Sequence, residues 1–133
     1  MPSYARRKVA SYRQVQQATT TPGQRLVMCY EAIIRDLEKA KEAFEDTSPN
    51  RFADVHNALH HAHQIINELV LALNTDAAPD LCESLAGLYR FWIDQPSDAN
   101  VQKSPGPITD VLDMVRDLRD TWRQADRAAA IGS

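Results

Sequence analysis

Residues 51–74 read RFADVHNALHHAHQIINELVLALN, and this stretch decides the fold class. Its apolar side chains recur in unbroken steps of three and four, which is the spacing of one helical face. They are Phe52, Val55, Leu59, Ala62, Ile66, Leu69 and Leu73. The stretch therefore predicts a long amphipathic helix that begins at the Ser48-Pro49 pair, stops near Asn74 and buries one face against other helices.

The segment before it has the same pattern and a clearer start. Thr21 can cap a helix, Pro22 suits the first helical position, and the Gln24 side chain can reach back to close a capping box. An apolar stripe at the same spacing follows, formed by Leu26, Tyr30, Ile33, Leu37, Ala40 and Phe44. We predict a second helix from residue 21 to about residue 46.

A third helix is expected to begin at Pro79, with Leu81, Leu85, Leu88 and Trp92 on its inner face. Pro96 interrupts this pattern, because proline lacks the N–H that a helix uses to bond the carbonyl four residues earlier. The helix either ends near residue 94 or continues with a kink to about residue 103, and the absence of a further helix breaker favours the kinked form.

The Ser104-Pro105-Gly106-Pro107 stretch is a loop signal, and a fourth apolar stripe follows it. Its members are Ile108, Leu112, Val115, Leu118, Trp122 and Ala125. Four amphipathic helices with short connections favour antiparallel neighbours. We therefore predict one all-α domain over residues 1–133: an up-and-down four-helix bundle over residues 21–128, preceded by an arm or short extra helix over residues 1–20.

Composition and charge narrow the class of protein. Hydrophobic residues make up 44% of the chain and charged residues 25%, which is ordinary for a globular domain. The first thirty residues carry five basic side chains and no acid, whereas the whole chain has a net charge of −3. With no nucleic-acid motif, no apolar run that could span a bilayer and no signal-peptide pattern, we expect a cytoplasmic chain whose basic arm folds back on its acidic body.

The two cysteines and the histidines are the candidates for catalytic or metal-binding residues. Cys29 and Cys82 have no metal-ligand spacing and lie beside apolar stripes, so they are expected to be reduced, buried thiols. His56, His60 and His63 follow steps of four and three, so all three could point the same way and hold zinc. His60 or His61 could instead serve phosphotransfer, as in histidine-containing bundles. Neither alternative has supporting motifs, since no Glu occupies a His-Glu-x-x-His pattern and no lysine or glycine follows the histidines.

The sequence therefore contains no recognisable catalytic constellation, and we expect a binding protein that is not an enzyme and needs neither metal nor cofactor. Histidine phosphotransfer and metal binding remain the alternatives.

Several short motifs, taken in order, resemble the flagellin-specific export chaperones of the FliS family. The first is Tyr12-Arg13-Gln14-Val15, followed by Thr20-Thr21-Pro22 and by LVMCYEAI at residues 26–33. Further matches are IINEL at residues 65–69 with Leu73-Asn74, LAGLY at residues 85–89, Ala99-Asn100, and LRDTW at residues 118–122. Together they cover about residues 12–125.

The resemblance implies an antiparallel bundle that binds the C-terminal segment of flagellin in the cytosol. Such a chaperone prevents premature polymerisation of flagellin and aids its secretion, and other flagellar export or regulatory proteins are further candidate partners. The resemblance also implies that the N-terminal arm covers part of the groove when the partner is absent, and Tyr4, Tyr12 and Val15 are the expected cap residues here.

The predicted partner-binding residues are Tyr12, Val15, Tyr89, Ala99, Asn100 and Val101. Tyr89 belongs to a motif of the resemblance, although an aromatic side chain on an apolar stripe is more often part of a core. Ala99, Asn100 and Val101 follow the expected kink at Pro96. We expect this small-residue patch to stay partly open and to admit a partner helix.

Overall fold

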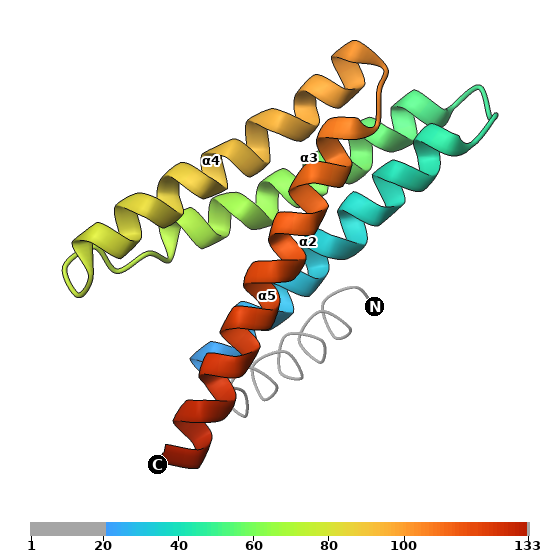
Figure 1. Cartoon of the computed structure of the whole chain (residues 1–133). Helices are drawn as coiled ribbons and strands as arrows, with labels where there is room; N and C mark the ends of the chain where they lie inside the picture. Colours follow the sequence, from blue (N-terminus) through green and yellow to red (C-terminus); the bar gives the residue numbers. More distant parts are fainter. Residues whose placement is uncertain (1–20, 133) are drawn as a thin grey trace, which may run out of the picture.

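The computed structural model describes residues 21–132, in which four α-helices follow one another in antiparallel order (Figure 1). They are α2 (Pro22–Glu45), α3 (Arg51–Leu71), α4 (Pro79–Gln102) and α5 (Gly106–Gly132). Helix α2 packs against α3 and α5, and α4 packs against the same two helices from the opposite side. This arrangement confirms the all-α class and the up-and-down four-helix bundle. The predicted arm, residues 1–20, lies outside the described residues.

The predicted start of α2 is confirmed in detail. The Thr21 hydroxyl accepts a hydrogen bond from the Gln24 backbone N–H, and the Gln24 side chain accepts one from the Thr21 N–H, both at 3.0 Å. Pro22 occupies the first turn, where its missing N–H costs no helical hydrogen bond. The helix ends at Glu45, with Asp46 as its C-terminal cap.

Both predicted boundaries of α3 need correction. The helix begins at Arg51 rather than at Ser48-Pro49. Ser48 lies in a turn before the helix, where its hydroxyl accepts a hydrogen bond from the Asn50 N–H at 3.2 Å. It ends at Leu71, three residues before Asn74. The Asn74 carbonyl instead accepts hydrogen bonds from backbone N–H groups of the following loop, including that of Ala78.

Helix α4 continues through Pro96, as the kinked alternative predicted, and ends at Gln102. Pro96 cannot donate to the Trp92 carbonyl, but the Ser97 hydroxyl donates to the neighbouring Ile93 carbonyl at 3.0 Å. Lys103 caps the helix in the left-handed conformation with φ of 56°, which ends the α-helical path.

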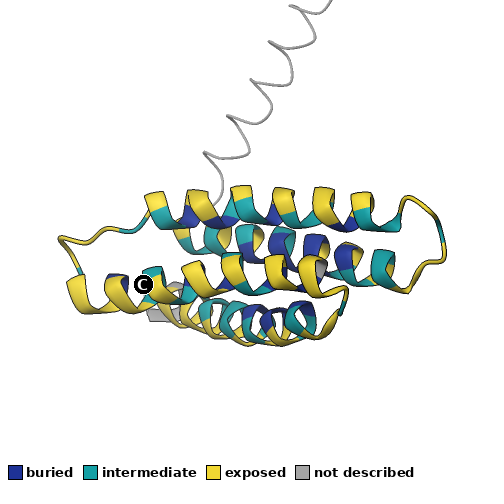
Figure 2. Ribbon diagram, turned by 90° about the horizontal axis from the view of Figure 1, so that it is seen from above, coloured by how far each residue is buried: buried dark blue, intermediate teal, exposed yellow. Residues whose placement is uncertain are grey.

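The core lies where the inner faces of the four helices meet, while their outer faces are exposed (Figure 2). Fully or almost fully buried side chains come from every helix: Tyr30, Ile33, Leu37, Val55, Ile66, Tyr89, Trp92, Ile108, Val111 and Val115. Two predicted core positions are corrected. Leu81 is 52% exposed at the start of α4, and Ala125 is exposed in the C-terminal half of α5.

Candidate partner-binding surface

A groove lies between the start of α2 and the C-terminal half of α5, which run together at one end of the bundle (Figure 1). It encloses about 500 Å³ and is open to solvent on one side. Its lining is mainly apolar and comprises Thr21, Pro22, Gly23, Gln24, Leu26, Trp122, Ala125, Asp126 and Ala129. An apolar depression of this size can accept the side chains of another polypeptide segment.

Gly23 brings the two helices close together at the rim of this groove. A Cβ atom at this position would collide with the Asp126 carboxylate, whose Cγ would lie 2.9 Å away. The Asp126 carboxylate also accepts a hydrogen bond from the Thr21 hydroxyl, with an oxygen–oxygen distance of 3.4 Å. A negative charge at the start of α2 is favourable, because the first N–H groups of a helix carry partial positive charge.

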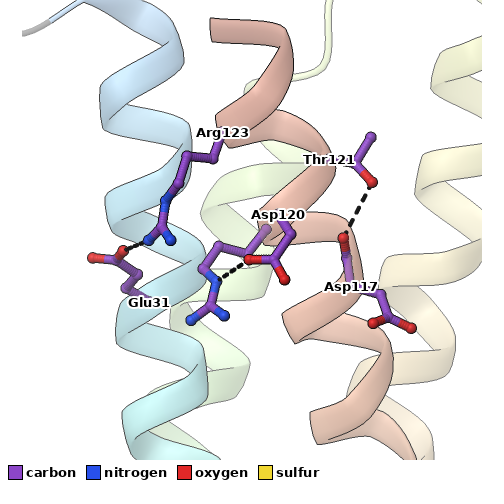
Figure 3. Close-up of polar contacts among 6 residues, drawn as sticks. Glu31, Asp117, Asp120, Thr121 and Arg123 are labelled. Atoms are coloured by element: carbon purple, nitrogen blue, oxygen red, sulfur yellow. Dashed lines mark hydrogen bonds and ion pairs between the residues drawn. The ribbon is translucent and has the colours of Figure 1, made fainter. Parts of the chain in front are cut away.

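Two ion pairs join α2 and α5 farther along the same seam. Glu31 contacts Arg123 at 2.5 Å, as Figure 3 shows, and Glu38 contacts Arg116 at 2.8 Å. The two acids are seven residues apart on α2, as are the two arginines on α5. All four side chains are partly exposed, so solvent weakens each pair and their effect is mainly to align the helices.

Helix α5 also carries polar contacts between its own residues. Figure 3 shows Asp120 bound by the neighbouring arginine, Arg119, at 3.0 Å, and the Thr121 hydroxyl donating to the Asp117 carbonyl at 3.1 Å. These contacts are local to the helix. They leave the groove side of α5 to Trp122, Ala125 and Ala129.

A buried aromatic cluster lies inside the bundle and links α2 to α4. The hydroxyl groups of Tyr30 and Tyr89 are 2.7 Å apart, and Trp92 packs edge-on against Tyr30 with ring centroids 5.6 Å apart. Burial raises the pKa of both tyrosines above the ordinary value. Within the described residues, the indole N–H groups of Trp92 and Trp122 are buried without a hydrogen-bond acceptor.

The predicted partner residues fall into different environments. Tyr89 is 1% exposed and Ala99 is fully buried, so the expectation that Ala99 stays partly open is wrong. The reason is that α4 continues past Pro96 and keeps its inner face against the bundle. Val101 is 81% exposed. The side chain of Asn100 lies outside the described part of the structure, as do Tyr4, Tyr12 and Val15, and the roles of all these residues in binding remain predictions.

Apolar side chains are also exposed away from the groove. Phe91 is 40% exposed on α4, and Met28 is 47% exposed on α2. Together with Leu81 and Val101 they give the bundle a partly apolar exterior. The exposure of Val101 agrees with the expected open patch, whereas Leu81 was expected on the inner face of its helix.

The structure brings together one polar pair that the sequence analysis missed. Asp36 is buried on α2, and its carboxylate lies 2.5 Å from Nδ1 of His61 on α3. The pair borders a polar depression of about 410 Å³ between the two helices. The sequence does indicate that Asp36 is buried, because it lies three residues after Ile33 and four before Ala40, on the apolar side of the helix.

The three histidines of the proposed zinc alternative do not form one site. His56 and His60 are exposed, whereas His63 is half-buried against α4, where it borders a small cavity beside Trp92 and Pro96. Among the described residues, no three His, Cys, Asp or Glu side chains are grouped so that they could hold a metal ion. Cys29 and Cys82 are free thiols, and burial together with the nearby Glu68 carboxylate raises the pKa of Cys29.

Comparison with known proteins decides the family. Residues 5–129 match the model of the family described as flagellar protein FliS. The chain belongs to the FliS family. The flagellar secretion chaperone FliS of Bacillus subtilis (strain 168) is 30% identical over 115 residues, which cover 86% of this chain and 83% of that protein. The flagellar secretion chaperone FliS of Campylobacter jejuni is 26% identical over 117 residues, covering 86% and 87% of the two chains.

A solved structure supports the same assignment. A crystal structure of a flagellar chaperone from bacteria superposes with a TM-score of 0.73 and 26% identity, covering 91% of this chain and 98% of the other. The FliS family is a family of chaperones and not of enzymes, and the resemblance seen in the sequence is confirmed. Between residues 21 and 132, no helix is both long enough and apolar enough to cross a membrane.

Proposed function

We propose that this chain is a cytoplasmic export chaperone that binds the C-terminal segment of flagellin, prevents its premature polymerisation and aids its secretion. Membership of the FliS family supports the chaperone role. The apolar groove between α2 and α5 is the observation that carries the binding proposal, because an aggregation-prone segment is kept soluble when its apolar side chains are covered.

In this proposal, an amphipathic helix of the flagellin segment inserts apolar side chains between Leu26 and Trp122. Ala125 and Ala129 line the same side of α5, and their small side chains leave room for the incoming residues. The exposed side chains of Phe91 and Val101 lie on another helix, so a long segment that leaves the groove would find further apolar contacts on α4.

The test is isothermal titration with a synthetic C-terminal segment of flagellin from the same bacterium. We expect one-to-one binding with a negative heat-capacity change, which marks the burial of apolar surface. Ala125→Glu places a charge in the groove and should weaken binding about tenfold or more. Ala128→Glu is the matched control, because Ala128 is exposed on the same helix but does not line the groove.

The possible outcomes separate two parts of the proposal. If the wild-type chain does not bind, flagellin is not the partner. If it binds and Ala125→Glu has no larger effect than Ala128→Glu, flagellin binds elsewhere on the bundle.

We further propose that residues 1–20 cover part of the groove in the free chaperone, through Tyr4, Tyr12 and Val15. Thr21, which directly follows this segment, lines the groove, and that position supports the proposal. Deletion of residues 1–17 should then raise flagellin affinity, lower the stability of the free bundle, or both. Unchanged affinity together with unchanged stability would contradict the covering role.

A further inference from the structure

A pair of histidines on the solvent-facing side of α3 has no role in the proposed flagellin site. His56 and His60 are one helical turn apart, and both side chains are exposed. Their imidazole rings are nearly parallel, with an interplanar angle of 13° and ring centroids 6.2 Å apart. The two rings are therefore stacked along the same face of α3.

We infer that His56 and His60 form a two-nitrogen chelate for a divalent transition-metal ion of the Ni²⁺, Cu²⁺ or Zn²⁺ class. Imidazole nitrogen is a preferred ligand of these ions, and residues four apart on a helix lie on the same face. The helix fixes the two ligands relative to each other before the ion arrives. Because an imidazole nitrogen binds an ion in the plane of its ring, the two exposed rings must turn from their stacked arrangement to bind one ion together.

Few contacts oppose these rotations. Nε2 of His60 lies 3.4 Å from the Gln64 side-chain amide, which is a long and weak hydrogen bond. The other two histidines of α3 are placed differently. His61 is held by the buried Asp36 carboxylate, and His63 faces α4, so neither adds a third nitrogen to the pair.

Two protein ligands leave coordination positions of the ion open. Tetrahedral Zn²⁺ would keep two positions for water or for donors of another molecule, unlike a closed structural site with four protein ligands. We therefore expect moderate, reversible binding that the fold does not need. The ion should stabilise the chain by binding the folded state, in which the two histidines lie side by side.

The test is titration of the full chain with Ni²⁺, followed by calorimetry and by the shift of the thermal unfolding midpoint. We expect one ion per chain and a higher midpoint with Ni²⁺ than without it. His56→Ala and His60→Ala should each remove both effects, whereas His63→Ala should leave both in place. With Cu²⁺ as the probe, electron paramagnetic resonance should detect two coordinating nitrogens in the wild-type chain and one or none in each loss variant.

Two results would overturn the inference. One is a wild-type chain that takes up no Ni²⁺ and shows no shift of its midpoint. The other is a double variant, His56→Ala with His60→Ala, that binds as the wild type does. Circular dichroism of the metal-free variants provides the folding control, and because the two positions are exposed, their helix content should equal that of the wild type.

Discussion

At the residue scale, the hydroxyl pair of Tyr30 and Tyr89 is a polar contact inside an otherwise apolar core. One hydroxyl donates a hydrogen bond to the other across 2.7 Å. Tyr30→Phe removes one partner and leaves the Tyr89 hydroxyl buried alone, so we expect a loss of about 1–3 kcal/mol of unfolding free energy. The double variant Tyr30→Phe with Tyr89→Phe should be more stable than the sum of its single variants predicts. Urea unfolding of the four proteins measures this, and strict additivity would contradict a direct bond.

The same two residues predict how stability depends on alkaline pH. Burial raises the pKa of Tyr30 and Tyr89 in the folded chain, so the folded state keeps phenol protons that the unfolded state releases. Stability contributed by these groups is fully present below the ordinary tyrosine pKa of about 10 and falls as pH rises beyond it. Unfolding midpoints measured from pH 8 upward should fall less steeply for the double Phe variant than for the wild type. Parallel curves would show that other groups cause the decline.

At the element scale, the Glu31–Arg123 and Glu38–Arg116 pairs align α2 with α5. Glu31→Arg should place two like charges together and cost roughly 1 kcal/mol or less, because the pair is partly exposed. Adding Arg123→Glu should restore most of the loss by exchanging the charges. Thermal unfolding of these variants measures both effects, with Glu42→Arg at an exposed position of α2 as the control. The differences should shrink in high salt, and a salt-independent cost would point to packing instead.

The helices themselves could be predicted because each has a local signal. The capping box at Thr21 and the apolar stripe through Tyr30 and Leu37 depend on neighbours in sequence, and both were confirmed. The boundaries of α3 were missed because Ser48 and Asn74, which both favour caps, use their hydrogen bonds in turns outside the helix. Whether α4 continues through Pro96 is harder to predict from sequence, because the tertiary packing of α4 decides whether the helix tolerates the missing hydrogen bond.

The site was less predictable than the fold. The groove exists because α2 and α5 meet at one end, so residues about a hundred positions apart in the chain line it together. The Asp36–His61 pair likewise requires α2 and α3 to be packed before either side chain has its partner. A single sequence records the faces of helices but not which faces meet, which explains why Leu26 and Ala129 were not chosen as groove residues.

At the scale of the whole molecule, the four helices of residues 21–132 contribute side chains to one shared core. We therefore expect residues 21–132 to unfold in a single cooperative transition. Trp92 and Trp122 report on tertiary packing from two different helices, and circular dichroism reports on the helices. The two signals should give the same midpoint in urea. A separate early loss of fluorescence would show that one helix detaches before the rest and would contradict a single domain.

The close contact between Gly23 and Asp126 affects the register in which α5 packs along α2. If α5 slipped by seven residues along α2, Glu38 would face Arg123 and Glu45 would face Arg116, so carboxylates would again meet guanidinium groups. The charges alone therefore fit two registers equally well. The slip would also carry the Asp126 carboxylate from Gly23 to the level of the buried Tyr30, where an unpaired charge is costly. Asp126 fits beside Gly23, which has no side chain, but not beside Tyr30, so this contact distinguishes two registers that the four charged residues leave open.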